Sequence, residues 1–285
     1  MLELAPLNPR LDQYVAEQVT GISRATAAKL VSSGKVAVDG EVVLKPAYRV
    51  KFGEVVEVDF APIELADIPT IDLPVLYEDD DCVVINKPVG LLTHSKGAFN
   101  PEPTVATWLA QRVPAMSGER AGIVHRLDRA TGGVMICAKT PQALAWLQKQ
   151  FSERKVKKMY VALVMGELKT PEAIIDMPIE RNPKKPQTFR VGSNGKPATT
   201  HYKVIKANPT YSLLELRPAT GRTHQLRVHL HQIGHPIVGD TFYAGPLAER
   251  LFLHAVELEI TLLNHERKTF TTELPSAFAK LIDKS

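Results

Sequence analysis

The spacing of apolar residues predicts a helical start to this chain. Over residues 10–16 the apolar side chains recur three and four positions apart, which places them on one helical face. A second helix is predicted over residues 24–33, because Ser23 can cap its amino end and Gly34 can end it. The pattern therefore predicts two short helices in succession.

The residues that follow alternate as a β-hairpin does. Two short apolar runs, at 36–38 and 42–43, flank Asp39-Gly40. An Asp-Gly pair between such runs favours a two-residue hairpin turn. Residues 1–60 are therefore predicted to form a small helix–helix–hairpin domain.

From residue 82 onward, continuous apolar runs replace the helical spacing. The runs at 82–86, 134–138 and 161–164 predict strands. A helix is predicted between Thr223, as its N-cap, and Gly234. Residues 82–285 are thus predicted to form a second, larger domain that contains both strands and helices.

The segment that joins these two regions differs from both in composition. Residues 61–81 contain seven acidic residues, no basic residue and three prolines. Self-repelling charge and proline favour an extended chain. We interpret this segment as an acidic linker that ends in a turn at Asp79–Asp81.

Overall composition narrows the class of protein. The 285 residues are 44% hydrophobic and 23% charged, as is usual for a globular chain, and no apolar run approaches the roughly 20 residues of a membrane helix. The chain does not begin with a basic region followed by an apolar core, so no secretory signal is expected. Cys82 and Cys137 lie in separate apolar runs and are interpreted as buried thiols. We expect a cytoplasmic protein without membrane association.

The distribution of charge says more than the net charge of +4. Residues 181–206 hold seven basic side chains and no acidic one. Such a stretch is typical of a protein that binds a polyanion, and equally of a solvated loop, so it does not decide between them.

Candidate chemistry is concentrated in residues 124–133. The apolar residues at 123–124 predict the end of a strand. Thr131-Gly132-Gly133 predicts the connection to the next strand. In an extended segment Arg126 and Asp128 project to one face. An acid beside a permanent cation is either a catalytic group or an ion pair that caps a hairpin.

This run resembles the signature of the RluA-type pseudouridine synthases, where His-Arg-Leu-Asp precedes Thr-Ser-Gly and the aspartate is catalytic. The match covers His125 to Asp128, Thr131 and Gly133, with Gly132 where the family usually has serine. Three further blocks resemble the family in the same order, at residues 84–91, 157–164 and 220–230.

The resemblance implies the roles of individual residues and the fold. Asp128 is the catalytic residue by this match, Tyr160 is the active-site tyrosine, and Arg227 is the cation that pairs with the aspartate. The implied fold class is α+β: a catalytic domain over residues 82–285, built on a mixed or antiparallel sheet and preceded by the helix–helix–hairpin domain.

The first domain resembles the RNA-binding module named after the fourth small-subunit ribosomal protein, and the match extends over residues 10–59. Its basic side chains are then expected to contact phosphates; they are Arg24, Lys29, Lys35, Lys45, Arg49 and Lys51. In the catalytic domain, Arg126 is expected to fill the space or grip the backbone when the target nucleotide leaves its stack. Arg222 is expected to contact RNA as well.

The family's reaction is the conversion of uridine to pseudouridine within structured RNA, and the linked RNA-binding module favours large-subunit ribosomal RNA over tRNA. Nothing enters or leaves in this isomerisation, so no cofactor is expected. The sequence accordingly has no Gly-x-Gly-x-x-Gly and no phosphate-binding loop. We expect the protein to act as a monomer.

Two other functions stay open. The first is a non-catalytic RNA-binding or ribosome-assembly protein, which only Gly132 suggests. The presence of Asp128, Tyr160 and Arg227 argues against it. A metal-dependent hydrolase is suggested by four histidines within residues 224–235. In a helix, however, residues two apart point about 200° from each other, and no carboxylate lies nearby before residue 240. We therefore expect no metal.

Overall fold

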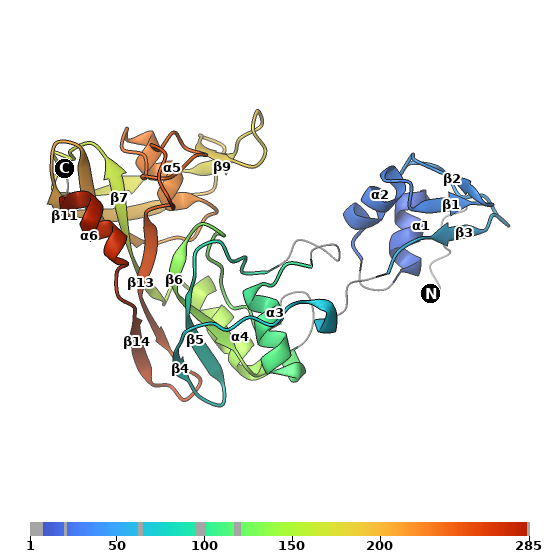
Figure 1. The fold of residues 1–285 in the computed structure, drawn as a ribbon, viewed down its shortest axis with the longest axis horizontal. Coiled ribbons are helices and arrows are strands. Elements are labelled where there is room, and N and C mark those ends of the chain that lie inside the picture. The colour runs from blue at the N-terminus through green and yellow to red at the C-terminus, as the bar shows by residue number, and fades with distance from the viewer. Residues whose placement is uncertain (1–7, 20–21, 62–64, 95–100, 117–120, 284–285) are drawn as a thin grey trace. The chain divides into compact units, whose positions relative to one another are not determined.

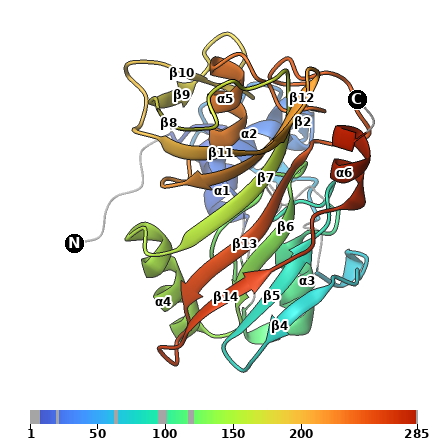
Figure 2. The ribbon, with the colours of Figure 1, turned by 90° about the vertical axis from the view of Figure 1, so that its left-hand side faces the viewer.

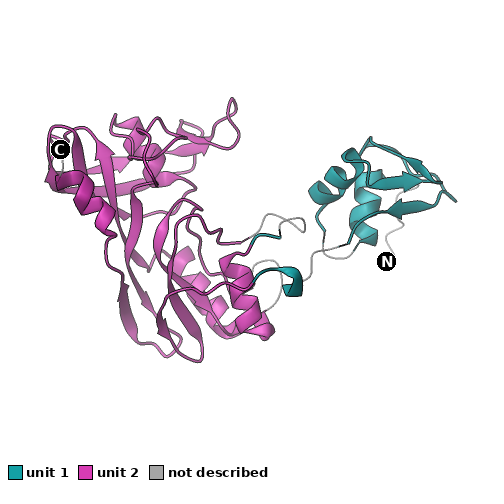
Figure 3. Cartoon of the chain, viewed as in Figure 1, with its two compact units in different colours: residues 1–69, 95–102 teal, residues 70–94, 103–285 magenta. Residues whose placement is uncertain are grey.

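The computed structural model describes residues 8–19, 22–61, 65–94, 101–116 and 121–283. The chain divides into two compact units (Figure 3). The first comprises residues 1–69 and 95–102, and the second comprises residues 70–94 and 103–285.

The first unit is built from two helices and a small antiparallel sheet (Figure 1). It contains α1 (Leu11–Gln18), α2 (Arg24–Ser32), β1 (Val36–Val38), β2 (Glu41–Val42) and β3 (Val56–Val58), followed by a short 3-10 helix at Leu65–Asp67. The strand order is β2-β1-β3.

Local chemistry explains these elements. Ser23 Oγ accepts a hydrogen bond from Thr26 N–H at 3.2 Å and so caps α2. Asp39 and Gly40 have positive φ values of 49° and 80°, as the tight turn between β1 and β2 requires. The predicted helices and hairpin are confirmed; β3, which completes the sheet, was not predicted.

The second unit is organised around one mixed sheet (Figure 2). In the part of the chain that the structure describes, its strand order is β4-β5-β6-β13-β7-β12-β11-β8, with β14 paired to β13. The β6–β13 pair is parallel and the other pairs are antiparallel. This confirms the α+β class.

The strands and helices of this unit have the following bounds. The sheet contains β4 (Val75–Glu78), β5 (Cys82–Lys87), β6 (Gly132–Ala138), β7 (Lys157–Met165), β8 (Glu172–Asp176), β11 (Thr199–Ala207), β12 (Tyr211–Pro218), β13 (Leu253–Thr261) and β14 (Arg267–Thr271). A separate hairpin pairs β9 (Ile179–Arg181) with β10 (Phe189–Val191). The helices are α3 (Val105–Arg112), α4 (Pro141–Ser152), α5 (Gln225–Gln232) and α6 (Ser276–Asp283), and a 3-10 turn spans Pro114–Met116.

The continuous apolar run of β5 is explained by burial on both faces of the sheet. Val83 and Ile85 pack with α3 residues such as Leu109, whereas Val84 packs with Leu147 of α4. A strand that is buried on both faces has no side exposed to water, so apolar and polar residues do not alternate along its sequence.

The structure differs from the expected acidic linker over its second half. Residues 75–78 form β4, an edge strand that pairs with β5, and Leu73 is buried. The run at 79–81 does form the predicted turn, because Asp79 Oδ1 accepts hydrogen bonds from Asp81 N–H and Cys82 N–H at 2.9 and 2.7 Å. The strand was not predicted because acidic residues flank it, at Asp72 and Asp79–Asp81, although β4 itself contains one acid, Glu78.

The expected strand at 123–124 is also wrong. Only a single bridge joins Ile123 to Cys137, and residues 124–131 run as an irregular segment into β6, which begins at Gly132. Thr131-Gly132-Gly133 is therefore not a hairpin corner.

Two histidines of this unit, His125 and His254, are neutral in the folded protein. His125 Nε2 accepts a hydrogen bond from Ile136 N–H at 3.2 Å, and its ring stacks on Phe151. His254 is 4% exposed, and neither ring nitrogen has a hydrogen-bond partner among the described residues. Burial lowers the pKa of His125 to about 3 and is the main cause that lowers the pKa of His254 to about 4.

We expect acid to destabilise this unit through these histidines. In the unfolded chain a histidine titrates near pH 6.5, so between pH 6.5 and about 4 the unfolded state binds more protons than folded His254 does. The free energy of unfolding therefore falls as the pH is lowered through this window, by about 2 kcal/mol per histidine between pH 7.5 and 5.

Urea unfolding near pH 7.5 and near pH 5 measures this loss of stability, in the wild type and in His254→Leu. The variant should lose less stability over this interval than the wild type. Equal losses in the two proteins would show that His254 does not contribute.

Candidate active site

A pocket lies over the central strands of the sheet, and it collects the residues of the sequence signature. We call it the central pocket. It is lined by Arg126, Leu127, Asp128, Thr131, Lys158, Tyr160, Pro218, Thr220, Gly221, Arg222, Thr223, His224, Gln225, Leu226, Arg227 and Leu253. The order β6-β13-β7 brings the segment before β6 close to β7, although these two are far apart in sequence. The structure thus brings together Asp128, Tyr160 and Arg227, as predicted, with Arg126 and Arg222.

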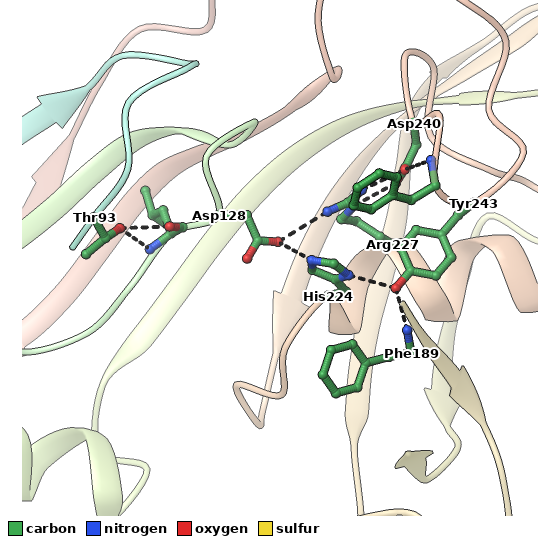
Figure 4. Close-up of polar contacts among 9 residues, drawn as sticks. Thr93, Asp128, Phe189, His224, Arg227, Asp240 and Tyr243 are labelled. Atoms are coloured by element: carbon green, nitrogen blue, oxygen red, sulfur yellow. Dashed lines mark hydrogen bonds and ion pairs between the residues drawn. The ribbon is translucent and has the colours of Figure 1, made fainter. Parts of the chain in front are cut away.

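Asp128 is fixed through its neighbour Leu127. The Leu127 side chain is buried in the core under α3. Thr93 Oγ1 donates to Leu127 O at 2.8 Å and accepts from Leu127 N–H at 3.3 Å, as Figure 4 shows. Thr131 N–H donates to Asp128 O at 3.0 Å. These contacts hold the Asp128 carboxylate in the pocket with 21% of the side chain exposed.

Arg227 of α5 is shared between two carboxylates. Its Nε and Nη2 donate to Asp240 Oδ2 and Oδ1 at 2.7 and 2.8 Å, while its Nη1 lies 3.5 Å from Asp128 Oδ2. Burial opposes its charge, but the hydrogen bonds and charge of Asp240 outweigh burial and raise the pKa of Arg227. The expected pairing with Asp128 is present, but Asp240 is the closer partner. Arg227 itself is buried.

His224, rather than the predicted Thr223, occupies the N-cap position of α5. It has a left-handed conformation, with φ of 57°, and its side chain does not cap the helix. Instead its Nδ1 lies 2.7 Å from Tyr243 Oη, and its Nε2 lies 3.7 Å from Asp128 Oδ2 (Figure 4). Burial lowers the pKa of His224, although the charge of Asp128 acts against this. His224 is thus a neutral group facing the carboxylate.

The neighbours of His224 determine which nitrogen carries its proton. Phe189 N–H donates to Tyr243 Oη at 2.9 Å, so the Tyr243 hydroxyl can donate its own proton to His224 Nδ1. A neutral imidazole then carries its proton on Nε2. This places an N–H opposite Asp128.

We expect Tyr243→Phe to disturb this arrangement. Without the hydroxyl donor, His224 should populate both neutral tautomers, and kcat should fall roughly three- to tenfold with little change in KM. Imidazole ¹⁵N chemical shifts, assigned with His224→Gln, report the tautomer directly. Tyr202→Phe, which removes a hydroxyl near Thr170 O, serves as the control. A single Nε2–H tautomer in Tyr243→Phe would contradict this assignment.

Tyr160 lies on β7, with its ring packed between two parts of the core. Burial, and to a smaller extent the charge of Asp128, raises the pKa of its hydroxyl. Its ring lines the central pocket, where an aromatic face can stack on a base.

Packing requires a glycine at position 133 and leaves little room for a side chain at position 132. Gly133 has φ of 118°, and a Cβ there would lie 2.1 Å from Ala255 O on the parallel strand β13. At Gly132 a Cβ would lie 3.0 Å from Lys87 O and 3.2 Å from His254 Nδ1. The glycine that departs from the family pattern therefore lies in a strand against His254, outside the lining of the central pocket.

The predicted RNA-contacting residues of the first unit are exposed, and several have local partners. Arg24 pairs with Asp12 at 3.2 Å, Lys35 pairs with Asp59 at 3.3 Å, and Arg49 donates to Asn8 O at 3.1 Å. Lys29, Lys45 and Lys51 are exposed as well.

The basic stretch 181–206 is partly neutralised by acids from outside it. Arg190 Nη2 lies 2.7 Å from Glu180, and Lys206 pairs with Asp283. The stretch is also divided among β9, β10 and β11, so its charges are distributed over several strands.

The histidines that suggested a metal have other partners. His229 Nδ1 lies 3.0 Å from Thr200 Oγ1, and its Nε2 lies 2.9 Å from Met177 O. His235 Nδ1 lies 2.9 Å from Met165 O. Across residues 8–283, leaving out the undescribed gaps, no group of three or more His, Cys, Asp or Glu could hold a metal ion. In the same residues no helix is long and apolar enough to cross a membrane.

Sequence reasoning missed several residues of the site. His224 was considered only as a metal candidate. No role was given to Asp240, Tyr243, Thr93 or Lys158. The adjacent motifs Gly239-Asp240 and Thr223-His224-Gln225 were the available signal.

Comparisons with known proteins identify the family. The RNA pseudouridylate synthase model matches residues 81–232, and the S4 domain model matches residues 9–56. The ribosomal large subunit pseudouridine synthase D of Vibrio cholerae is 42% identical over 245 residues, which cover 84% of this chain and 74% of that protein. The protein of the same name from Pasteurella multocida is 36% identical over 305 residues, covering 99% and 93%.

A solved structure is also similar. The human RNA pseudouridylate synthase domain containing 1 matches with a TM-score of 0.60 and 29% identity, over 76% of this chain and 87% of that one. The chain belongs to the RNA pseudouridylate synthase family and carries an RNA-binding S4 domain at its amino end.

Proposed function

We propose that this pseudouridine synthase isomerises uridines of large-subunit ribosomal RNA, with Asp128 as the catalytic residue. The observation that carries the proposal is the position of the Asp128 carboxylate in the central pocket, between Arg227 Nη1 and His224 Nε2 at 3.5 and 3.7 Å. The ribosomal target is supported by the names of the relatives, which cover most of the chain, and by the S4 domain.

The reaction conserves every atom of the nucleotide. The bond between N1 of uracil and C1′ of the ribose breaks, the base turns, and a bond forms between C5 and C1′. The proton lost from C5 is balanced by the proton gained at N1. No group is added or removed, so the reaction requires neither an oxidant nor an energy source.

In the proposed mechanism Asp128 acts on the ribose as an anion. A target uridine that leaves its stack and fills the pocket displaces water. The Arg227 guanidinium and the His224 N–H then take over the stabilisation of the carboxylate charge. Tyr160 packs against the base, and the exposed Arg126 fills the space or grips the backbone that the nucleotide leaves.

The domain assignment is part of the proposal. Residues 1–60 serve as the RNA-binding domain, with the six basic residues of this domain named above as its phosphate contacts. A linker follows over residues 61–69. It is shorter than the linker expected over residues 61–81, because the second unit begins at residue 70 and includes β4. The catalytic domain follows the linker. The enzyme acts as a monomer in the cytoplasm, where ribosomal RNA is modified.

Purified full-length protein tests the proposal on transcribed large-subunit rRNA, small-subunit rRNA and tRNA, with pseudouridine mapped chemically. We expect product in the large-subunit RNA alone. Product only in tRNA or small-subunit RNA would contradict the proposed target. Product formed equally by Asp128→Asn would contradict the proposed catalytic residue.

A further inference from the structure

A second cavity adjoins the central pocket and has an unusual lining. We call it the side cavity. It shares Lys158, Thr220, Gly221 and Arg222 with the central pocket, and its remaining lining residues are Phe151, Ser152, Arg154, Val156 and Ala219. The lining contains three cations and no acidic side chain. A cavity of this charge, connected to a nucleotide pocket, is suited to an anion.

Lys158 is the cation common to both cavities. It lies on β7, two residues before Tyr160, so the two side chains project to the same face of the strand. Its neighbour Lys157 projects to the opposite face and pairs with Glu259 at 3.1 Å. Lys158 itself has no ion pair or hydrogen bond of its ammonium group with any residue that the structure describes. Two adjacent lysines therefore have different surroundings.

An ammonium group in the position of Lys158 favours an anion from outside the chain. Lys158 is partly buried, and burial lowers its pKa without a carboxylate to act against it. A charge that has lost water and gained no partner is costly. An incoming phosphate would supply the missing partner.

Gly221 keeps the ammonium group accessible. A Cβ at this position would lie 3.8 Å from Lys158 Nζ, so a longer side chain would extend over the lysine. The turn is held in place because Gln225 Oε1 accepts from Thr220 Oγ1 at 2.6 Å and from Arg222 N–H at 3.0 Å. Arg222 Nε donates to Pro197 O at 3.1 Å, which fixes the second cation beside this glycine.

We infer that Lys158 and Arg222 form a phosphate subsite at the junction of the two cavities, which binds the RNA backbone next to the nucleotide in the central pocket. The inference rests on the proposed function, in that it takes RNA as the occupant of the central pocket. Lys158 binds substrate here and takes no part in bond breaking.

Salt-dependent binding tests the subsite. Each phosphate contact made by a lysine contributes about 0.7 to 0.9 to the slope of log affinity against log salt. Full-length wild type, Lys158→Met and Lys157→Met are titrated with transcribed large-subunit rRNA at several KCl concentrations. Lys158→Met should reduce the slope by this amount and weaken binding roughly three- to tenfold, with KM raised and kcat within about twofold. Lys157→Met should match the wild type.

Lys158→Arg keeps the test decisive if methionine disturbs the fold. The arginine variant retains the charge and should retain the wild-type slope, with an unchanged melting temperature as the check on folding. A wild-type slope in folded Lys158→Met, or a lower kcat without a change in slope, would overturn the subsite. Because a phosphate contact is independent of sequence, the slope change should also appear with an unrelated RNA. The subsite can therefore be tested even if large-subunit rRNA is not the substrate, and the two proposals are contradicted by different results.

Discussion

Asp128→Asn is expected to reduce pseudouridine formation by at least roughly a thousandfold, while RNA affinity and folding stay close to wild type. The amide has the size of the carboxylate but lacks its charge and nucleophilicity. Since Leu127 and Thr93 position this residue through main-chain contacts and core packing, the substitution leaves the segment in place. Single-turnover release of tritium from RNA labelled at C5 of uracil measures the rate.

The control for this prediction is Asp80→Asn, an exposed aspartate in the turn between β4 and β5. It removes the same charge outside the central pocket and should leave the rate unchanged. A rate for Asp128→Asn within tenfold of wild type would show that this carboxylate is not the catalytic group.

Arg227→Met is expected to cost about 3–5 kcal/mol of the free energy of unfolding. The Asp240 side chain is 0% exposed and receives two hydrogen bonds from this guanidinium. Removing the arginine leaves a buried carboxylate whose remaining hydrogen bond comes from Phe242 N–H at 3.1 Å. Urea or guanidinium unfolding monitored by circular dichroism measures the loss.

The double variant Arg227→Met with Asp240→Leu separates stability from catalysis. Replacing both members of a buried ion pair by apolar residues is often nearly neutral, so most of the lost stability should return. Activity should stay low, because Asp128 still lacks the guanidinium that lies 3.5 Å away. Full activity in the double variant would contradict the role given to Arg227, and a loss under 1 kcal/mol in the single variant would contradict the importance of the buried pair.

Local signals in the sequence were sufficient for much of the fold. Ser23, Asp39-Gly40 and the apolar spacing of α1 act within a few residues, and the structure has the predicted helices and hairpin there. β4 was missed because it is held by pairing with β5 and by packing of Tyr77 against Phe270. Neither interaction can be predicted from these four residues, which lie between the acidic residues Asp72 and Asp79–Asp81.

The site shows the same difference between signals that are local in the sequence and contacts that form only in the folded chain. The family resemblance alone pointed to Asp128, Tyr160 and Arg227, and these three residues line one pocket. Asp240 and Tyr243 were not predicted as partners, since they meet Arg227 and His224 only after the chain has folded back between α5 and β13. His224 takes a left-handed conformation that spacing in a sequence does not reveal, which is why Thr223 was taken as the cap.

The most direct test of the central claim is a pseudouridine map of ribosomal and transfer RNA from cells that lack this protein, complemented with wild type or with Asp128→Asn. We predict that sites in large-subunit ribosomal RNA lose their pseudouridine, and that only the wild-type protein restores them. Restoration by Asp128→Asn would contradict catalysis by this carboxylate. A loss confined to transfer RNA would contradict the ribosomal target.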